Sequence, residues 1–133
     1  MMHHIKLVEI ILYVHDQKQS AEFYGKIFRK APDLDVPGMT EFILSENCTL
    51  GLMPNNGIAK ILQDKTPHPE SGNGIPRCEL YLRVENIERE FENAKSCGAT
   101  EISPILPRNW GDNVCYFADS DGHIIAFAEK TSS

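Results

Sequence analysis

Apolar and polar residues near the start of the chain follow a pattern that predicts a β-strand over residues 6–14. Every second residue from Ile10 to Val14 would point to one side of this strand, and every second residue from Glu9 to Tyr13 to the other. Both sides are largely apolar. The strand is therefore predicted to be central in its sheet rather than at an edge.

The spacing of apolar residues then changes from two to between three and four. Ala21, Tyr24 and Phe28 recur at intervals that predict a helix over residues 17–28. Asp16 precedes this run and is the predicted N-cap, because its carboxylate can accept a hydrogen bond from a free N–H of the first turn. The first part of the chain thus reads as a strand followed by a helix.

Shorter elements follow this helix. Residues 33–38 contain two breakers and are predicted to be an irregular link, while residues 40–44 and 49–53 are predicted to form two short strands. Residues 55–77 are rich in Gly, Asn and Pro and are predicted to be mostly loop, although Ile58–Leu62 could form one turn of helix. A loop of this length in a compact domain is usually functional or mobile, so it is a candidate lid.

The pattern of the first half returns after this loop. Glu9–Val14 recurs in altered form as Glu79–Val84, seventy residues later. A helix from Ile87 to about Gly98, a strand over 99–105 and a hairpin of 114–118 with 123–128 are predicted to follow. Each unit is thus strand–helix–strand–strand–strand, which is an α+β arrangement of two βαβββ modules. Module one spans about 5–56, the linker about 57–76 and module two about 77–130, in a single domain of residues 1–133 whose halves share one core.

Composition narrows the classes of function. The formal net charge of −6 disfavours a nucleic-acid or anionic-membrane partner. No apolar run approaches the roughly 20 residues of a membrane span, and the first residues lack the apolar core of a secretory signal. We therefore expect a cytoplasmic protein. Its four cysteines form no C-x-x-C pair, which argues against a zinc knuckle or redox dithiol.

Three stretches carry a resemblance to a known superfamily. They are Ile11–Asp16 followed by Ala21–Tyr24, Val84–Asn86 leading to Gly98-Ala99, and Tyr116–His123, which is similar to a family turn of the form F-x-D-P-D-G-H. The chain resembles the vicinal oxygen chelate superfamily of glyoxalases, bleomycin-resistance proteins and dioxygenases. The resemblance implies two βαβββ modules whose curved mixed sheets surround a cleft. It also implies that the protein binds a small molecule and forms a homodimer.

The resemblance also implies where a metal would bind. Metal-using members take ligands from the first and last strand of each module, and the matching positions here are Glu9, Gly51, Glu79 and Ala126. Glyoxalases have imidazole or amide ligands and two further carboxylates at these places. Only Glu9 and Glu79 could serve as ligands here, so a divalent ion such as Mg, Mn, Ni or Zn is expected only with help from water or substrate.

Strand alternation predicts the lining of the cleft. If the two glutamates face inward, so do Tyr13, Met53, Tyr81 and Arg83, which we take as candidate ligand-binding residues. Phe42, Cys115 and Phe117 are further candidates for the wall. In the loop of residues 108–112, which follows the strand predicted at 99–105, Trp110 could stack on a planar ligand and Arg108 could meet an anion. Alternatively, Trp110 packs over a sheet edge or a dimer contact.

Three interpretations of Glu9 and Glu79 remain open. The pair could bind a divalent cation, or act without metal as a catalytic general acid and base that shares one proton. A third interpretation is that each is solvated or paired with Arg83 or Arg77. The first function hypothesis is accordingly a glyoxalase/bleomycin-resistance-like protein that binds a small molecule in an apolar cleft. The alternatives are a metal-dependent lyase, isomerase or transferase similar to lactoylglutathione lyase, and a non-catalytic dimeric module.

Overall fold

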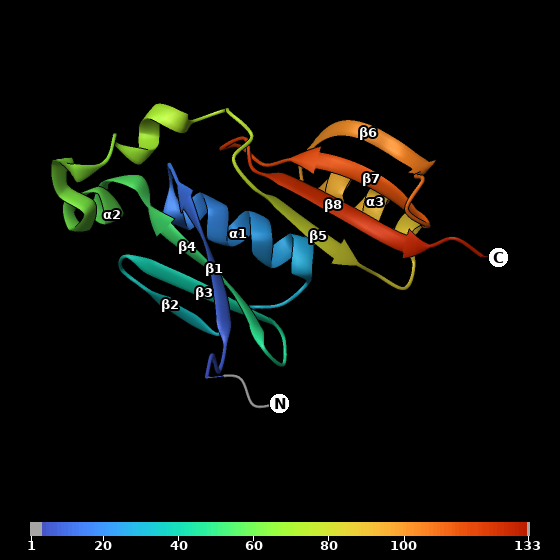
Figure 1. Cartoon of the computed structure of the whole chain (residues 1–133), viewed down its shortest axis with the longest axis horizontal. Helices are drawn as coiled ribbons and strands as arrows, with labels where there is room; N and C mark the ends of the chain where they lie inside the picture. The colour runs from blue at the N-terminus through green and yellow to red at the C-terminus, as the bar shows by residue number, and fades with distance from the viewer. Residues whose placement is uncertain (1–3, 133) are drawn as a thin grey trace. The chain divides into compact units, whose positions relative to one another are not determined.

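The computed structural model describes residues 4–132 and divides the chain into two compact units (Figure 1). Unit 1 ends at Ser71 and unit 2 begins at Gly72. The elements of unit 1 are β1 (Val8–Val14), α1 (Gln17–Phe28), β2 (Leu34–Val36), β3 (Met39–Ser45), β4 (Cys48–Pro54) and α2 (Asn55–Leu62), followed by short 3-10 turns at Gln63–Lys65 and Pro69–Gly72. Those of unit 2 are β5 (Glu79–Arg83), α3 (Ile87–Ser96), β6 (Thr100–Pro107), β7 (Asp112–Ala118) and β8 (Ile124–Lys130).

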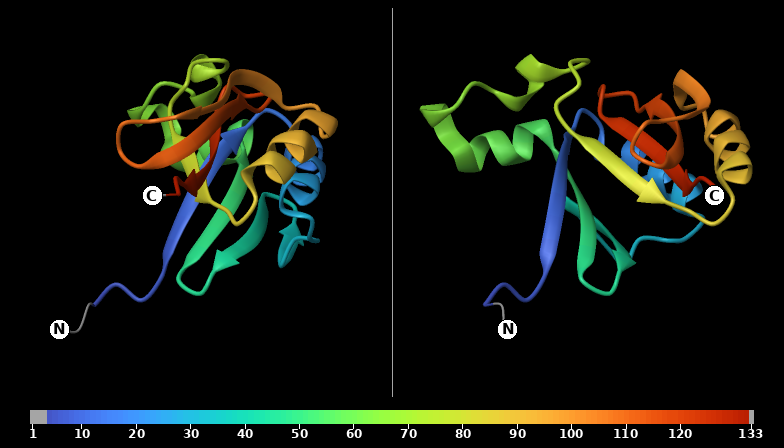
Figure 2. Two further views of the ribbon diagram at one scale, coloured as in Figure 1. Left: turned by 90° about the vertical axis from the view of Figure 1, so that its right-hand side faces the viewer. Right: turned by 45° about the vertical axis from the view of Figure 1, so that its right-hand side comes forward.

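Each unit is a four-stranded mixed sheet with a helix packed on one face (Figure 2). The strand orders are β1-β4-β3-β2 and β5-β8-β7-β6, and the first pair in each sheet is parallel. This confirms the prediction of an α+β fold of two βαβββ modules. The prediction that residues 6–14 form a central strand is wrong, because β1 lies at an edge of the sheet of its own unit.

Aromatic residues fix which face of each sheet is covered by its helix. In unit 1, Phe42 of β3 is fully buried and lies 5.4 Å, ring to ring, from Phe28 of α1. In unit 2, Phe117 of β7 is fully buried and lies 5.3 Å from Phe91 of α3. The repeat seen in the sequence is thus a repeat of core packing. We call the opposite face of each sheet, turned away from α1 or α3, the distal face.

The two main helices begin where the sequence indicates. Asp16 caps α1 by accepting a hydrogen bond from the backbone N–H of Gln19 at 3.0 Å, as predicted. Asn86 caps α3 in the same way through the N–H of Arg89. None of the helices in residues 4–132 has both the length and the apolar character that crossing a membrane requires.

The segment predicted to be loop is more ordered than expected. Residues 55–62 form α2, whose Ile58 is buried. Further on, the segment Gly72–Arg77 is bonded to the β7–β8 turn of unit 2. The N–H of Gly74 and the guanidinium of Arg77 both donate to the carbonyl of Asp121, at 2.9 Å each. The helix at the start of this segment is thus longer than the single turn expected at residues 58–62.

Candidate functional site

The most connected group of predicted site residues lies on the distal face of unit 2. Tyr81 is on β5, and its hydroxyl donates a hydrogen bond to the carboxylate of Asp112, the first residue of β7. Arg83 donates to the same carboxylate oxygen at 2.7 Å, and the indole Nε1 of Trp110 donates to the Tyr81 hydroxyl at 2.9 Å. Three predicted site residues are thus linked through Asp112, which was not identified from the sequence.

Burial and charge determine which group donates and which accepts in these hydrogen bonds. The Asp112 side chain is only 1% exposed, and its bonds from Tyr81 and Arg83 hold its pKa below the ordinary value for aspartate. The pKa of Tyr81 is raised, mainly because its hydroxyl is shielded from water and also because it is bonded to Asp112. At neutral pH the tyrosine therefore keeps its proton and donates it, while accepting from the indole.

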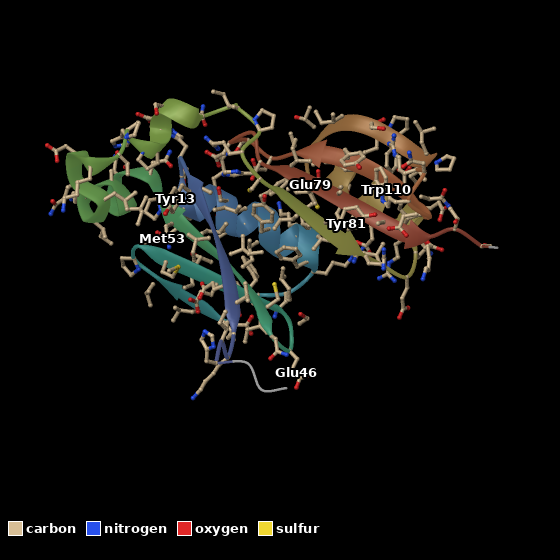
Figure 3. All side chains as sticks on the ribbon, in the orientation of Figure 1. Tyr13, Glu46, Met53, Glu79, Tyr81 and Trp110 are labelled. Atoms are coloured by element: carbon tan, nitrogen blue, oxygen red, sulfur yellow. The ribbon has the colours of Figure 1, made fainter. Side chains whose placement is uncertain are left out.

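The loop that carries Trp110 is held in place by its own backbone. Gly111 has a φ of +97°, a conformation that glycine adopts without steric cost. Its carbonyl accepts bonds from both the N–H and the hydroxyl of Thr131, each at 3.0 Å, and the N–H of Arg108 donates to the Asp112 carbonyl at 2.8 Å. Trp110 is 56% exposed and Tyr81 is 39% exposed. Figure 3 shows both labelled side chains together in unit 2.

Arg108 is directed elsewhere within unit 2. Its Nη2 donates to the Ser103 hydroxyl at 2.8 Å and to the Val114 carbonyl at 3.2 Å, and its guanidinium lies 5.1 Å from the centre of the Tyr116 ring. These contacts fix the Arg108 side chain at the start of the loop that carries Trp110. Its anion-binding role stays a prediction.

Unit 1 presents a different set of predicted residues. Tyr13 of β1 and Met53 of β4 are register partners on the distal face, and both are partly buried. Glu9 lies on the same face of β1, where its pKa is raised to about 7 by burial, by a hydrogen bond with Glu41 and by the charge of Glu41. Glu41 on β3 was not identified from the sequence. Its neighbour Phe42 was expected in the cleft wall, but Phe42 faces α1.

The other wall candidates are corrected in the same way. Cys115 and Phe117 are fully buried on the α3 side of the sheet of unit 2. Strand alternation instead places Val114 and Tyr116 on the distal face, where Val114 forms an apolar cluster with Ala126 and Ala128. If the alternation along β3 and β7 is assumed one residue out of phase, the two faces of the strand are exchanged. This explains why Phe42, Cys115 and Phe117 were expected in the cleft wall but lie on the helix side.

Glu79 opens β5 and is exposed. The arginines considered as partners for the glutamates have other contacts, because Arg83 bonds Asp112 and Arg77 bonds the Asp121 carbonyl. Glu9 and Glu79 belong to different units, so their pairing as a catalytic or metal-binding pair stays a prediction.

At two of the four metal-ligand positions implied by the resemblance, Gly51 and Ala126, the residues present cannot bind a divalent metal ion. A Cβ at Gly51 would lie 2.5 Å from Cδ1 of Ile11 and 2.6 Å from Oε2 of Glu9, so side chains of β1 already fill the space above it. Ala126 is fully buried, with Tyr81 and Tyr116 as its register partners. Neither position has a donor atom. Within residues 4–132, no cluster of three or more His, Cys, Asp or Glu side chains is placed to hold a metal ion.

Unit 1 also contains an open groove of about 900 Å³ on the other side of its sheet. It runs between α1 and residues 30–37, with Ala21 and Gly25 on the helix and Pro32 and Asp35 opposite. Lys18 and Lys26 are among the charged residues along it. The groove contains none of the residues predicted to bind a ligand.

Comparison with known proteins agrees with this architecture. The uncharacterized protein YraH of Bacillus subtilis (strain 168) is 27% identical over 124 residues, covering 91% of this chain and 95% of that protein. A glyoxalase/bleomycin resistance protein/dioxygenase from Nocardioides has a TM-score of 0.78 at 17% identity, covering 100% of this chain and 88% of that one. A glyoxalase-related enzyme from Fulvimarina pelagi has a TM-score of 0.77 at 22% identity, covering 93% and 87%. These two structures show a shared fold.

The sequence match to a family is almost complete in length. The family described as the glyoxalase-like domain matches residues 7–132. This span includes both repeats and all the residues discussed above. The chain therefore belongs to the glyoxalase-like domain family of the vicinal oxygen chelate superfamily.

Proposed function

We propose that the protein binds a planar small molecule against the distal face of unit 2, with Trp110 and Tyr81 as the contact surface. One observation carries this proposal: a large, exposed indole is held in a fixed orientation by a hydrogen bond to Tyr81. Tyr81 is itself fixed by the buried Asp112. Exposed aromatic rings of fixed orientation lose little conformational entropy when a ligand stacks on them.

The surroundings of the two rings suggest what the ligand would carry. Glu79 and Arg83 lie two residues to either side of Tyr81 on the same face of β5. The Arg83 side chain is 60% exposed even though one of its nitrogens bonds Asp112, which leaves further N–H groups at the surface. We therefore propose an aromatic or heteroaromatic ligand with a polar substituent, either an acid that meets Arg83 or a base that meets Glu79.

The test uses the only tryptophan of the chain as its reporter. The indole N–H gives a single resolved signal in a ¹H–¹⁵N spectrum, and stacking on Trp110 is expected to shift it. We would titrate the protein with 2-naphthoate and 2-naphthylmethylammonium, and with the saturated decalin analogue of each. Saturable shifts are expected for at least one naphthyl compound, with the saturated analogue at least tenfold weaker, which corresponds to about 1.4 kcal/mol.

Variants locate the binding surface, with calorimetry as the readout. Trp110→Ala is expected to weaken naphthyl binding at least tenfold, and Tyr81→Phe several-fold, because the latter keeps the ring but loses both hydrogen bonds. Ile61→Ala is the matched control, since it removes an exposed apolar side chain from α2 of unit 1. Equal affinity of Trp110→Ala and the unaltered protein, or no indole shift at millimolar ligand, would refute the proposal.

The other expectations from the sequence stay predictions. They include ligand contacts from Tyr13, Met53 and Arg108, lyase, isomerase or transferase chemistry with a divalent metal at Glu9 and Glu79, and assembly as a homodimer. The absence of donor atoms at Gly51 and Ala126 favours the binding function over metal-assisted chemistry of the glyoxalase kind.

A further inference from the structure

Two carboxyl groups face each other across a glycine on the distal face of unit 1. In the register of this sheet, Gly51 of β4 has Ile11 of β1 on one side and Glu41 of β3 on the other. Glu9 lies two residues before Ile11 on the same face, and its Oε2 would be only 2.6 Å from a Cβ at Gly51. The missing side chain at Gly51 therefore provides the space in which the Glu9 carboxyl lies next to Glu41.

Among the residues of β1–β4, no basic side chain lies on this face beside the two carboxyls. By strand alternation, the residues of β1–β4 on the distal face of unit 1 are Glu9, Ile11, Tyr13, Leu34, Val36, Met39, Glu41, Ile43, Thr49, Gly51 and Met53. The remaining titratable group among them is the phenol of Tyr13. The lysines of α1 belong to the opposite face, and Lys60 of α2 is exposed beyond the far end of β1 from Glu9. Within these elements, repulsion between the carboxylates has no cation to relieve it.

The donors and acceptors around Glu9 indicate that one of the two carboxyls carries a proton. Oε2 of Glu9 is buried and has no hydrogen-bond partner. The neighbouring Glu41 carboxyl also offers acceptors only. A proton on Glu9 would turn the orphaned oxygen into a donor to Glu41 and would remove one of the two facing charges. We propose that Glu9 and Glu41, brought together over Gly51, hold one shared proton in place of a metal ion.

The electrostatics of the site support this arrangement. Burial is the largest factor that raises the pKa of Glu9 to about 7, followed by the hydrogen bond with Glu41 and then by the charge of Glu41. A molecule on this face would thus meet a neutral hydroxyl donor below pH 7 and a pair of carboxylates above it. Unit 1 would then favour hydrogen-bond acceptors at lower pH and cationic groups at higher pH. This inference is independent of the Trp110 surface, which lies in the other unit.

Carboxyl ¹³C shifts of selectively labelled glutamates, followed from pH 3 to 9, test the proposal directly. One carboxyl is expected to titrate near pH 7, roughly 2.5 pH units above an ordinary glutamate. That signal should vanish in Glu9→Gln, and its midpoint should fall by at least one unit in Glu41→Gln. Glu46→Gln, in the exposed turn between β3 and β4, is the matched control and should leave the midpoint unchanged (Figure 3).

Two results would overturn the proposal. One is that every glutamate of the unaltered protein titrates below about pH 5.5, a measurement that needs no variant to fold. The other is that millimolar Mg²⁺, Mn²⁺ or Zn²⁺ lowers the raised midpoint in a saturable way, which would show that the two carboxylates form a cation site instead. An unchanged midpoint with all three ions supports the shared proton.

Thermal unfolding gives a second readout of the same proton. A raised pKa means that the stabilisation from the neutral form is fully present below about pH 4.5 and is lost as the pH rises through about 7. The unfolding midpoint of the protein should therefore fall between pH 5 and pH 8, and Glu9→Gln should fall less. A fall of equal size in both proteins would contradict the assignment to Glu9.

Discussion

Replacing Gly122 with alanine is expected to lower the free energy of unfolding by about 2–4 kcal/mol. Gly122 has a φ of +90°, which costs an L-residue about 1 kcal/mol. A Cβ there would also lie 2.6 Å from the carbonyl carbon of Gly74, and this neighbour is backbone that cannot rotate away. Thermal unfolding followed by circular dichroism should show the midpoint lowered by on the order of 10 °C.

Gly98→Ala separates the two contributions to this loss. Gly98 has nearly the same backbone conformation, with a φ of +88°, but a Cβ there would meet nothing within 4 Å. It should lose only the conformational term, about 1 kcal/mol. If the two variants were equally stable, the contact between Gly74 and the β7–β8 turn would carry no energetic weight.

Phe42→Ala and Phe117→Ala are each expected to cost about 3–5 kcal/mol. Both rings are fully buried, and each packs against an aromatic ring of the helix of its own unit. Truncation removes apolar contacts and leaves a cavity that the two flanking secondary elements cannot easily close. Chemical denaturation followed by fluorescence and circular dichroism would measure both losses.

The neighbouring residue supplies a control for the first of these variants. Ile43 follows Phe42 on β3 but is 51% exposed, so Ile43→Ala should change stability by no more than about 0.5 kcal/mol. A loss below about 1 kcal/mol for Phe42→Ala would mean that the ring does not contribute to the core as described. In each phenylalanine variant, coincident fluorescence and circular dichroism transitions would show that the two units unfold together.

Long amphipathic segments were predictable because their pattern is set by their own residues. The helix at residues 17–28 and its cap at Asp16 match the prediction. β2 was missed because it has three exposed residues next to Pro37 and Gly38, and exists through pairing with β3. α2 begins with Asn55-Asn56-Gly57, a composition typical of turns, and is stabilised by the burial of Ile58, which depends on tertiary contacts.

For the candidate sites, the sequence predicted which residues share a sheet face better than it predicted which residues they contact. Alternation along one strand placed Tyr81 and Arg83 together, as the structure does. Trp110 was chosen because it is the only tryptophan in the sequence. Glu41 was missed because the phase of β3 was assumed one residue out, and Asp112 because β7 begins two residues before the strand predicted at 114–118. One signal was available for Glu41, since shifting the assumed phase of β3 by one residue buries Phe42 and places Glu41 across from Gly51.

The attachment of Gly72–Arg77 to the β7–β8 turn determines where the two modules can be separated. The sequence repeat alone suggests a cut close to Cys78, just before β5 begins. A cut there would remove the backbone that Gly122 is shaped to accommodate and would leave the Asp121 carbonyl without two of its donors. Exchange of modules between relatives, whether by recombination or by design, should therefore join them between Ser71 and Gly72.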